Sequence, residues 1–300
     1  MAIAQSRQVA EMITGRTGQR VEIVGVTTLG DVSREQLTQI GGTGVFVSAL
    51  REALLGGEVD MAVHSLKDLP AGPAAGIALA AVPARDDPRD ALVARDGAKL
   101  ADLPPGARIG TGSPRRAAQL LGIRGDLRCV PIRGNAGTRL GKVSDGELDA
   151  VVLAYAGLAR IGQAGAVTQV FEPDEMLPAP GQGALAVECR AADSGLAALL
   201  RAVTDLASEA AVTAERSLLE ALQAGCSAPI GAYAAGGDQL RMRAAVMSPD
   251  GSRVLRAHAG GPAGRARQLG RDLAAELLRA GASELVGGSE EDASSGNDVQ

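Results

Sequence analysis

Short apolar or β-branched segments alternate with segments of helical period as far as about residue 205, and this order constrains the fold more than any other feature. Such alternation predicts an α/β fold in which helices cover both faces of parallel sheets. Ligands then bind at the carboxyl ends of the strands. The expected strands are 21–27, 60–64, 77–82, 91–94, 107–111, 129–132 and 150–154. The expected helices are 45–55, 114–121, 137–145 and 156–161.

Two segments rich in proline and glycine divide this part of the chain into two doubly wound lobes. We expect DLPPG at 102–106 to link the lobes and LPAPGQG at 177–183 to be the return crossing. A small third α+β domain should follow, with helices at 205–224 and 265–280 and strands at 230–234, 240–246 and 254–259. The expected domains are 1–84 with 183–202, then 88–178, then 206–286, and a disordered tail at 287–300.

Composition excludes several classes of protein. The chain has no apolar run near 18 residues and no signal-peptide pattern, so we expect a cytoplasmic protein with no membrane partner. Only 1% of the residues are aromatic and the net charge is −5, which disfavours binding to nucleic acid. Cys129, Cys189 and Cys226 form no C-x-x-C motif and there are only two histidines, so we expect reduced thiols and no metal site.

Arginine is concentrated in one stretch of this acidic chain. Residues 108–139 contain a single acid, Asp126, and seven arginines: Arg108, Arg115, Arg116, Arg124, Arg128, Arg133 and Arg139. We interpret the stretch as a focused anion site. Within it, ARIGTGSPRRAAQLLG predicts a strand, a turn and a helix that opens at Pro114 with Ser113 as its N-cap. Backbone N–H groups at that helix start, with Arg115 and Arg116, would receive a carboxylate or phosphate. A solvated arginine pair is the alternative.

Two further segments place polar groups where expected strands end. VHSLKDLP at 63–70 places Ser65, Lys67 and Asp68 in the ligand position of an α/β lobe, although a surface salt bridge between Lys67 and Asp68 is the alternative. IRGNAGTRL at 132–140 repeats the order of strand, glycine turn and helix, with an arginine near each end.

Cys226 is the cysteine that we expect to be accessible. The segment EALQAGCSAPIGAYA at 220–234 ends a helix at Gly225 and exposes Cys226 in the turn that follows. A thiol on a loop is more available than a core thiol, but a small buried apolar residue is an equally open interpretation.

Taken together, these segments resemble the porphobilinogen deaminase family, also called hydroxymethylbilane synthase. The motifs VHSLKDLP, GTGSPRRAAQL, IRGNAGTRL, DAVVLAYAGLARIG, LPAPGQGALAVECR and AGCSAPIGAYA occur in the family's order. The resemblance implies a transferase that condenses porphobilinogen units head to tail into a linear tetrapyrrole and releases ammonia at each step. It also implies a dipyrromethane cofactor that is bound to Cys226 through a thioether.

The resemblance assigns roles to individual residues. Asp68 matches the catalytic aspartate, which can hydrogen-bond pyrrole N–H groups and stabilise the cationic azafulvene that forms when the amine leaves. Lys67 is implied beside it as a catalytic residue that contacts the cofactor region. The other cofactor-binding residues implied are Ser65, Thr111, Ser113, Arg115 and Arg116. The substrate-binding residues implied are Arg133, Arg139, Arg160, Phe46 and Gln182. We expect leucine at Arg116 or Arg133 to change stability little, because neither substitution creates a core cavity.

One departure concerns the start of the chain. The family normally begins with a strand of the form R-I-x-T-R-x-S-x-L-A, and this chain starts at Met1 within the region that follows it, AIAQSRQVAEMI. We therefore expect the first lobe to lack its first strand. The alternatives to a monomeric transferase are an inactive, truncated homologue and a non-catalytic anion-binding module with two lobes, like a solute-binding protein.

Overall fold

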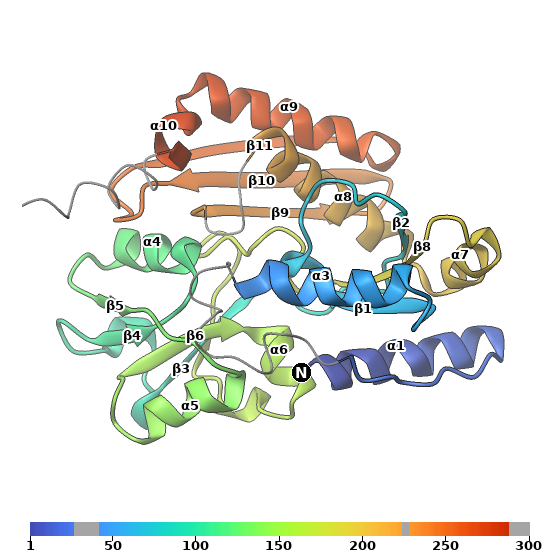
Figure 1. Cartoon of the computed structure of the whole chain (residues 1–300). Helices are drawn as coiled ribbons and strands as arrows, with labels where there is room; N and C mark the ends of the chain where they lie inside the picture. Colours follow the sequence, from blue (N-terminus) through green and yellow to red (C-terminus); the bar gives the residue numbers. More distant parts are fainter. Residues whose placement is uncertain (27–41, 224–227, 288–300) are drawn as a thin grey trace, which may run out of the picture.

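The computed structural model describes residues 1–26, 42–223 and 228–287, and of residues 42–46 and 286–287 it describes the backbone only. The strands in these residues form three separate sheets, two of three strands and one of five. Figure 1 shows the first sheet with its helices on the right, the five-stranded sheet at lower left, and the third sheet above both.

The first sheet has the order β1-β8-β2, and β8 runs antiparallel to both neighbours. Its strands are β1 (Met61–Ser65), β2 (Ile77–Ala81) and β8 (Leu185–Arg190). Its helices are α1 (Ala2–Thr17), α3 (Gly42–Leu55) and α7 (Ser194–Leu200). Val9 and Ile13 of α1 pack against Leu185 and Val187 of β8, which makes one buried aliphatic core.

The second sheet has the order β5-β4-β6-β3-β7. Its strands are β3 (Asp90–Ala94), β4 (Arg108–Gly110), β5 (Arg128–Val130), β6 (Ala150–Ala154) and β7 (Gln169–Val170). Its helices are α4 (Pro114–Ile123), α5 (Ala136–Ser144) and α6 (Tyr155–Arg160). β4 is parallel to β5 and β6, whereas β3 is antiparallel to β6 and β7. The carboxyl ends of β4 and β5 therefore meet at one edge of the sheet.

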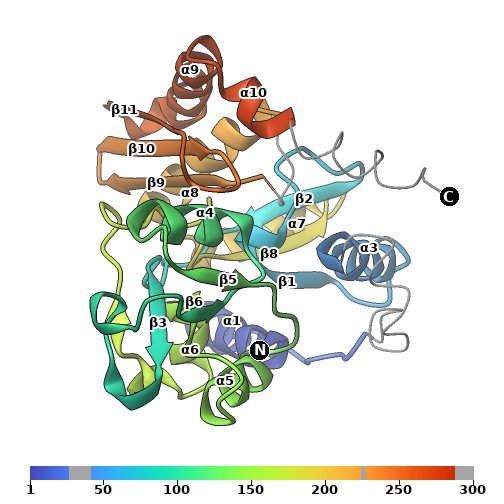
Figure 2. The ribbon, with the colours of Figure 1, turned by 90° about the vertical axis from the view of Figure 1, so that its left-hand side faces the viewer.

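The third sheet is an antiparallel meander that is covered by two long helices. Its strands are β9 (Ile230–Gly236), β10 (Gln239–Met247) and β11 (Val254–Pro262), in the order β11-β10-β9. Its helices are α8 (Leu206–Ala221), α9 (Ala266–Arg279) and α10 (Ala282–Gly287). On the other side of this sheet lies α4, as Figure 2 shows, with Ala118 packed against Ala245 and Met247. This contact joins the third sheet to the second.

Short 3-10 turns complete the described structure: Leu66–Asp68, Arg95–Gly97, Leu100–Asp102, Ala164–Ala166, Arg201–Val203 and Ala263–Arg265. Most of the expected elements are confirmed, with ends that differ by a few residues, and the α/β class with two lobes and a small α+β unit holds. The segment 177–183 is the return crossing, because it joins β7 of the second sheet to β8 of the first.

Three sequence expectations about the fold were wrong. The sheets are not parallel throughout, because β8 enters the first sheet from the return crossing and pairs antiparallel with β1 and β2. Residues 21–26 are not a strand, since no backbone partner pairs with them in the described part of the chain, and Thr27 lies outside it. The segment 102–106 does not link the lobes, because β3 before it and β4 after it belong to the same sheet.

Candidate active site

The turn after β1 carries Lys67 and Asp68 and is fixed by the return crossing. The backbone N–H of Leu66 donates to Ala184 O at 3.0 Å. Gly181 has φ 75°, a backbone conformation that favours glycine, and it lies so close to the turn that a Cβ there would be 3.3 Å from the backbone nitrogen of Lys67. From the other side, Gln5 Nε2 donates to Ser65 Oγ at 2.7 Å. The turn is therefore held in place by residues from two distant segments.

The turns after β4 and β5 lie side by side. A Cβ at Gly112 would lie 2.7 Å from Ile132 O, so this close approach also requires glycine. The backbone N–H of Ser113 donates to Thr111 Oγ1 at 3.2 Å, and Ser113 occupies the N-cap position of α4 without a side-chain cap bond. The parallel pairing thus brings Thr111 and Ser113 next to the turn that carries Arg133.

A single buried carboxylate, that of Asp90, organises the arginine pair at the start of α4. Arg115 Nη1 donates to Asp90 Oδ2 at 2.7 Å, and Arg116 Nε donates to Asp90 Oδ1 at 2.8 Å. Gln182 Nε2 donates to the same Oδ1 at 2.9 Å. Asp90 has no exposed surface, and Arg115 and Arg116 are 3% and 5% exposed. The two arginines therefore do not form the solvated pair that the sequence left open.

Gln182 connects this cluster to the turn that carries Lys67. Lys67 Nζ donates to Gln182 Oε1 at 3.3 Å, while Gln182 Nε2 also donates to Pro88 O at 2.7 Å. No salt bridge joins Lys67 to Asp68, and among the described residues none donates a hydrogen bond to the Asp68 carboxylate. This carboxylate is only partly buried, so it is available to a ligand.

The charges of the site perturb one another across the two lobes. Burial by itself would raise the pKa of Asp90, but the charges of Arg115 and Arg116 hold this pKa well below the usual value for aspartate. Burial, together with the charge of Arg116, lowers the pKa of Lys67 to about 8. Burial and, after it, the charge of Arg116 also lower the pKa of Arg139. Residues from three segments therefore share one positive field.

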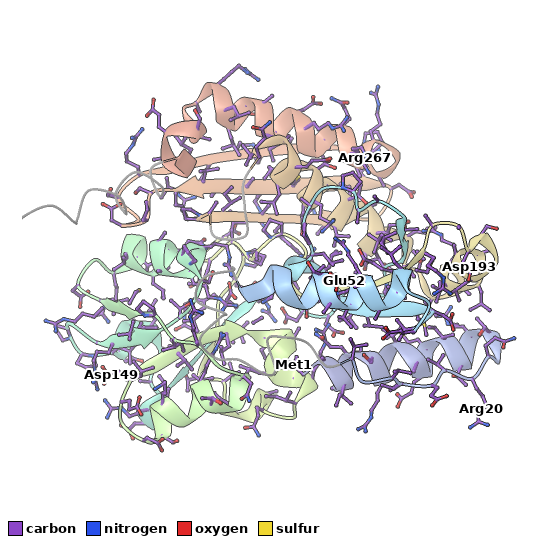
Figure 3. All side chains as sticks on the ribbon, in the orientation of Figure 1. Met1, Arg20, Glu52, Asp149, Asp193 and Arg267 are labelled. Carbon is purple, nitrogen blue, oxygen red and sulfur yellow. The ribbon has the colours of Figure 1, made fainter. Side chains whose placement is uncertain are left out.

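The seven arginines of 108–139 do not form one anion site, which corrects the sequence interpretation. Arg108 lies at the amino end of β4 and pairs with Asp149, which Figure 3 shows at the outer edge of the molecule. Arg128 lies opposite Arg108 in the register of β4 and β5. Arg124 pairs with Asp126 at 2.7 Å. These three lie away from the carboxyl ends of the strands, where the remaining four are found.

The other expected substrate-binding arginines differ in their partners. Arg133 is exposed and forms no hydrogen bond or ion pair with another described residue. Arg139 Nε donates to Gly134 O at 2.8 Å and has no acidic partner in the described ranges. Arg160 pairs with Asp86 at 2.7 Å and donates to Gly183 O at 2.8 Å, so it ties α6 to both crossings between the lobes. Arg160 therefore has an acidic partner, whereas Arg133 and Arg139 have none among the described residues.

A second buried carboxylate, that of Glu215 in α8, ties the third sheet to the two crossings. Arg85 Nη1 and Nη2 donate to Glu215 at 2.7 and 3.1 Å. The backbone N–H of Gly181 donates to Glu215 at 2.6 Å, and that of Ala234 in β9 does so at 2.8 Å. Arg85 also lies over the Tyr233 ring, 5.4 Å from its centroid.

The cysteines fall into two groups. Cys129 in β5 is half-buried and Cys189 in β8 is buried, and burial raises the pKa of both thiols. A raised pKa disfavours the thiolate, which is the reactive form. Cys226 and the side chain of Phe46 lie outside the described residues.

Sequence reasoning missed Asp90, Gln5 and Glu215. Asp90 directly precedes the buried run Ala91–Ala94, and an aspartate that continues an apolar strand is seldom buried without a partner. That position was the available signal. Nothing in the sequence pattern marks Gln5 as a partner of Ser65.

Within the described ranges, no helix has both the length and the apolar character needed to cross a membrane. In the same ranges, histidine, cysteine and acidic side chains do not gather in groups of three or more that could hold a metal ion.

Two family models match the chain. The one described as porphobilinogen deaminase, dipyromethane cofactor binding domain, matches residues 1–198, and the one described as porphobilinogen deaminase, C-terminal domain, matches residues 210–279. The porphobilinogen deaminase of Thermobifida fusca is 62% identical over 296 residues, which cover 95% of this chain and 92% of that protein. Porphobilinogen deaminase 1 of Streptomyces coelicolor is 55% identical and covers 96% and 94%. The enzyme of Mycolicibacterium paratuberculosis is 52% identical and covers 99% and 97%.

Among solved structures, an arginine-specific periplasmic binding protein of Salmonella typhimurium aligns with a TM-score of 0.38 and 13% identity. It covers 68% of this chain and 82% of that one.

Proposed function

Because the chain belongs to the porphobilinogen deaminase family, we propose that it condenses porphobilinogen into hydroxymethylbilane with release of ammonia, as this enzyme family does in tetrapyrrole biosynthesis. One observation carries the proposal to this chain: a partly exposed carboxylate, Asp68, lies on the turn beside Lys67, which is linked through Gln182 to buried arginines. A substrate with a pyrrole N–H and two carboxylates matches this arrangement, because the N–H suits the Asp68 carboxylate and the carboxylates suit the cations.

The residues present fit the family's dipyrromethane cofactor. Its acetate and propionate arms require fixed cations, and arginine binds carboxylates through two parallel N–H groups. Arg115 Nε is buried and has no hydrogen-bond partner within the described residues, so this cluster retains donor capacity. Arg115, Arg116, Lys67, Ser65, Thr111 and Ser113 would hold the arms, and Cys226 would form the thioether. When bound, the group supplies the nucleophilic pyrrole carbon to which each unit is added.

In this mechanism Asp68 acts on the substrate. Its carboxylate accepts the pyrrole N–H and stabilises the positive charge that develops on the ring as ammonia leaves. Lys67 keeps its ammonium form at neutral pH, since its pKa is about 8, and it neutralises a carboxylate arm. Arg133 and Arg139 receive the arms of the incoming unit, while Gln182 and Arg160 fix the crossings around them. Phe46 would contribute an apolar surface near the substrate.

The same proposal includes the state and organisation of the protein. We propose a monomeric cytoplasmic enzyme that requires no partner chain or metal. Its domains would be 1–84 with 183–202, then 88–178, then 206–286. The strands of each sheet fall within one of these units, which supports the boundaries.

Incubation of the purified protein with porphobilinogen tests the proposal. We expect ammonia release together with hydroxymethylbilane, and an intact mass that exceeds the sequence mass by two covalently bound pyrrole units. A protein that binds porphobilinogen but neither carries the adduct nor releases ammonia would instead be an anion-binding module.

A further inference from the structure

Two segments that are distant in the sequence from Asp90 and from each other, the start of α4 and the return crossing, converge on the carboxylate of Asp90. Both of its oxygens are used: Oδ2 accepts from Arg115, and Oδ1 accepts from Arg116 and Gln182. The Gln182 amide is itself fixed, because its Nε2 donates to Asp90 and to Pro88 O while its Oε1 faces Lys67 at 3.3 Å. Asp90 therefore contacts Arg115, Arg116 and Gln182 directly, and it reaches Lys67 only through Gln182.

The hydrogen-bond inventory differs between the two arginines. Arg116 donates from Nε to Asp90, from Nη1 to Val152 O at 3.2 Å and from Nη2 to Gln182 Oε1 at 3.4 Å. Arg115 donates from Nη1 alone, to Asp90 and to Leu177 O, and its buried Nε has no partner within the described residues. Arg116 is therefore held from all sides, whereas Arg115 keeps donors that the protein does not use.

One carboxylate between two buried guanidinium groups leaves the cluster with excess positive charge. A buried charge without a partner is unfavourable, so the cluster gains stability when a second anion approaches it. Without Asp90, two cations would lie side by side with no anion between them, and their repulsion would turn at least one of them away.

We propose that Asp90 is a positioning residue: it does not touch the substrate, but it holds Arg115 and Arg116 in one arrangement and leaves the unused donors of Arg115 for a carboxylate arm of the pyrrole ligand. This inference rests on the proposed function, and it adds a residue that acts through two others.

Asp90→Asn tests the inference, because the amide has the shape of the carboxylate but places an NH₂ group against an arginine donor. Labelling of arginine with phenylglyoxal, mapped on peptides, reads the accessibility of Arg115 and Arg116 in the absence of substrate. In Asp90→Asn we expect severalfold faster labelling of both arginines. We also expect a smaller fraction of protein with the covalent cofactor by intact mass. The KM for porphobilinogen should rise by about tenfold or more, as for the loss of one charge-assisted contact.

Glu188→Gln is the matched control. Glu188 is likewise buried, and it pairs with Arg51 at 2.6 Å and with His64 at 3.3 Å, away from Asp90. A purely structural role for Asp90 would make the two variants alike. We expect both to melt at lower temperature, and only Asp90→Asn to change arginine labelling and KM.

Asp90→Glu covers the case in which Asp90→Asn does not fold, because it keeps the charge and moves the oxygens by one methylene. It should raise the KM and the labelling of Arg115. Labelling and KM within about twofold of the parent in either folded variant would overturn the inference. Since labelling needs no turnover, a parent protein without activity would refute the proposed function and leave this test intact.

Discussion

Replacing Arg116 and Arg133 by leucine separates two residues that look equivalent in the sequence. The sequence predicts that neither change alters stability, but only Arg133 is exposed and without a described partner. Arg116 is 5% exposed and donates to Asp90 at 2.8 Å, so its removal takes away one of the two cations of a buried carboxylate.

The magnitude follows from that geometry. Arg116→Leu leaves Asp90 paired with Arg115, so the cost is that of the lost charge-assisted hydrogen bond rather than of an unpaired charge. We take about 3 kcal/mol, the upper end for such a bond, because Arg116 also loses its bond to Val152 O. At about 2–4 °C per kcal/mol for a chain of this size class, Arg116→Leu should lower the melting temperature by roughly 6–12 °C. Arg133→Leu should change the free energy of unfolding by less than about 0.5 kcal/mol.

Thermal melting at pH 7 and the length of the pyrrole chain bound to the protein are the two measurements. On the proposed function both variants should stall elongation: Arg133→Leu removes a cation proposed to receive a carboxylate arm, and Arg116→Leu disturbs the cluster around Asp90 that holds Arg115. Arg128→Leu is the control, since Arg128 is an exposed arginine at the opposite end of β5 and should affect neither measurement. If Arg116→Leu melted within about 2 °C of Arg133→Leu, the interpretation of Asp90 as a carboxylate that needs both arginines would be wrong.

Three further predictions concern the turn after β1 and the cysteines. Because the pKa of Lys67 is lowered to about 8, kcat/KM should fall as the pH rises through about 8 and the ammonium is lost. Stability should move the other way: the unfolded chain binds more protons at Lys67 between about pH 8 and 10.5, so Lys67 should add about 3 kcal/mol to the free energy of unfolding across that window. This contribution is measured as the difference from Lys67→Arg, which should show neither effect. Asp68→Asn should lower turnover by about 10²–10³-fold with little loss of stability, and turnover within about tenfold of the parent would exclude its electrostatic role. Peptide mapping should find the pyrrole adduct on Cys226, and an adduct on Cys129 or Cys189 would contradict the assignment.

Local patterns were sufficient for most of the elements. β6 and the helices α4 and α9 were predicted within a few residues, because their apolar periods and end signals lie within the segment itself. The segment 21–26 shows the limit of this reasoning. Its β-branched residues favour a strand, but a strand also needs a neighbour, and propensity does not supply one.

The residue types of the candidate site could be predicted from the sequence, but the partners of its charged side chains could not. The strand-end rule predicted that Lys67, Asp68 and Arg133 lie where a ligand would bind, and the parallel register of β4 and β5 agrees with that prediction for the arginine. The rule did not show that Arg108 and Arg116 have different surroundings. Arg108 lies at the start of β4, whereas Arg116 pairs with Asp90, an acid 26 residues earlier in the chain. Partners of this kind depend on the tertiary fold.

The Glu215 carboxylate has a consequence for how the protein unfolds. It accepts hydrogen bonds from Arg85 on the outgoing crossing, Gly181 on the return crossing and Ala234 in the third sheet. If the third sheet unit separated from either crossing, the buried Glu215 carboxylate would lose hydrogen-bond partners. This loss of free energy opposes the unfolding of one sheet while the other two stay folded. The three units should therefore melt in one calorimetric transition, with a van't Hoff enthalpy equal to the calorimetric enthalpy, rather than as three modules in sequence.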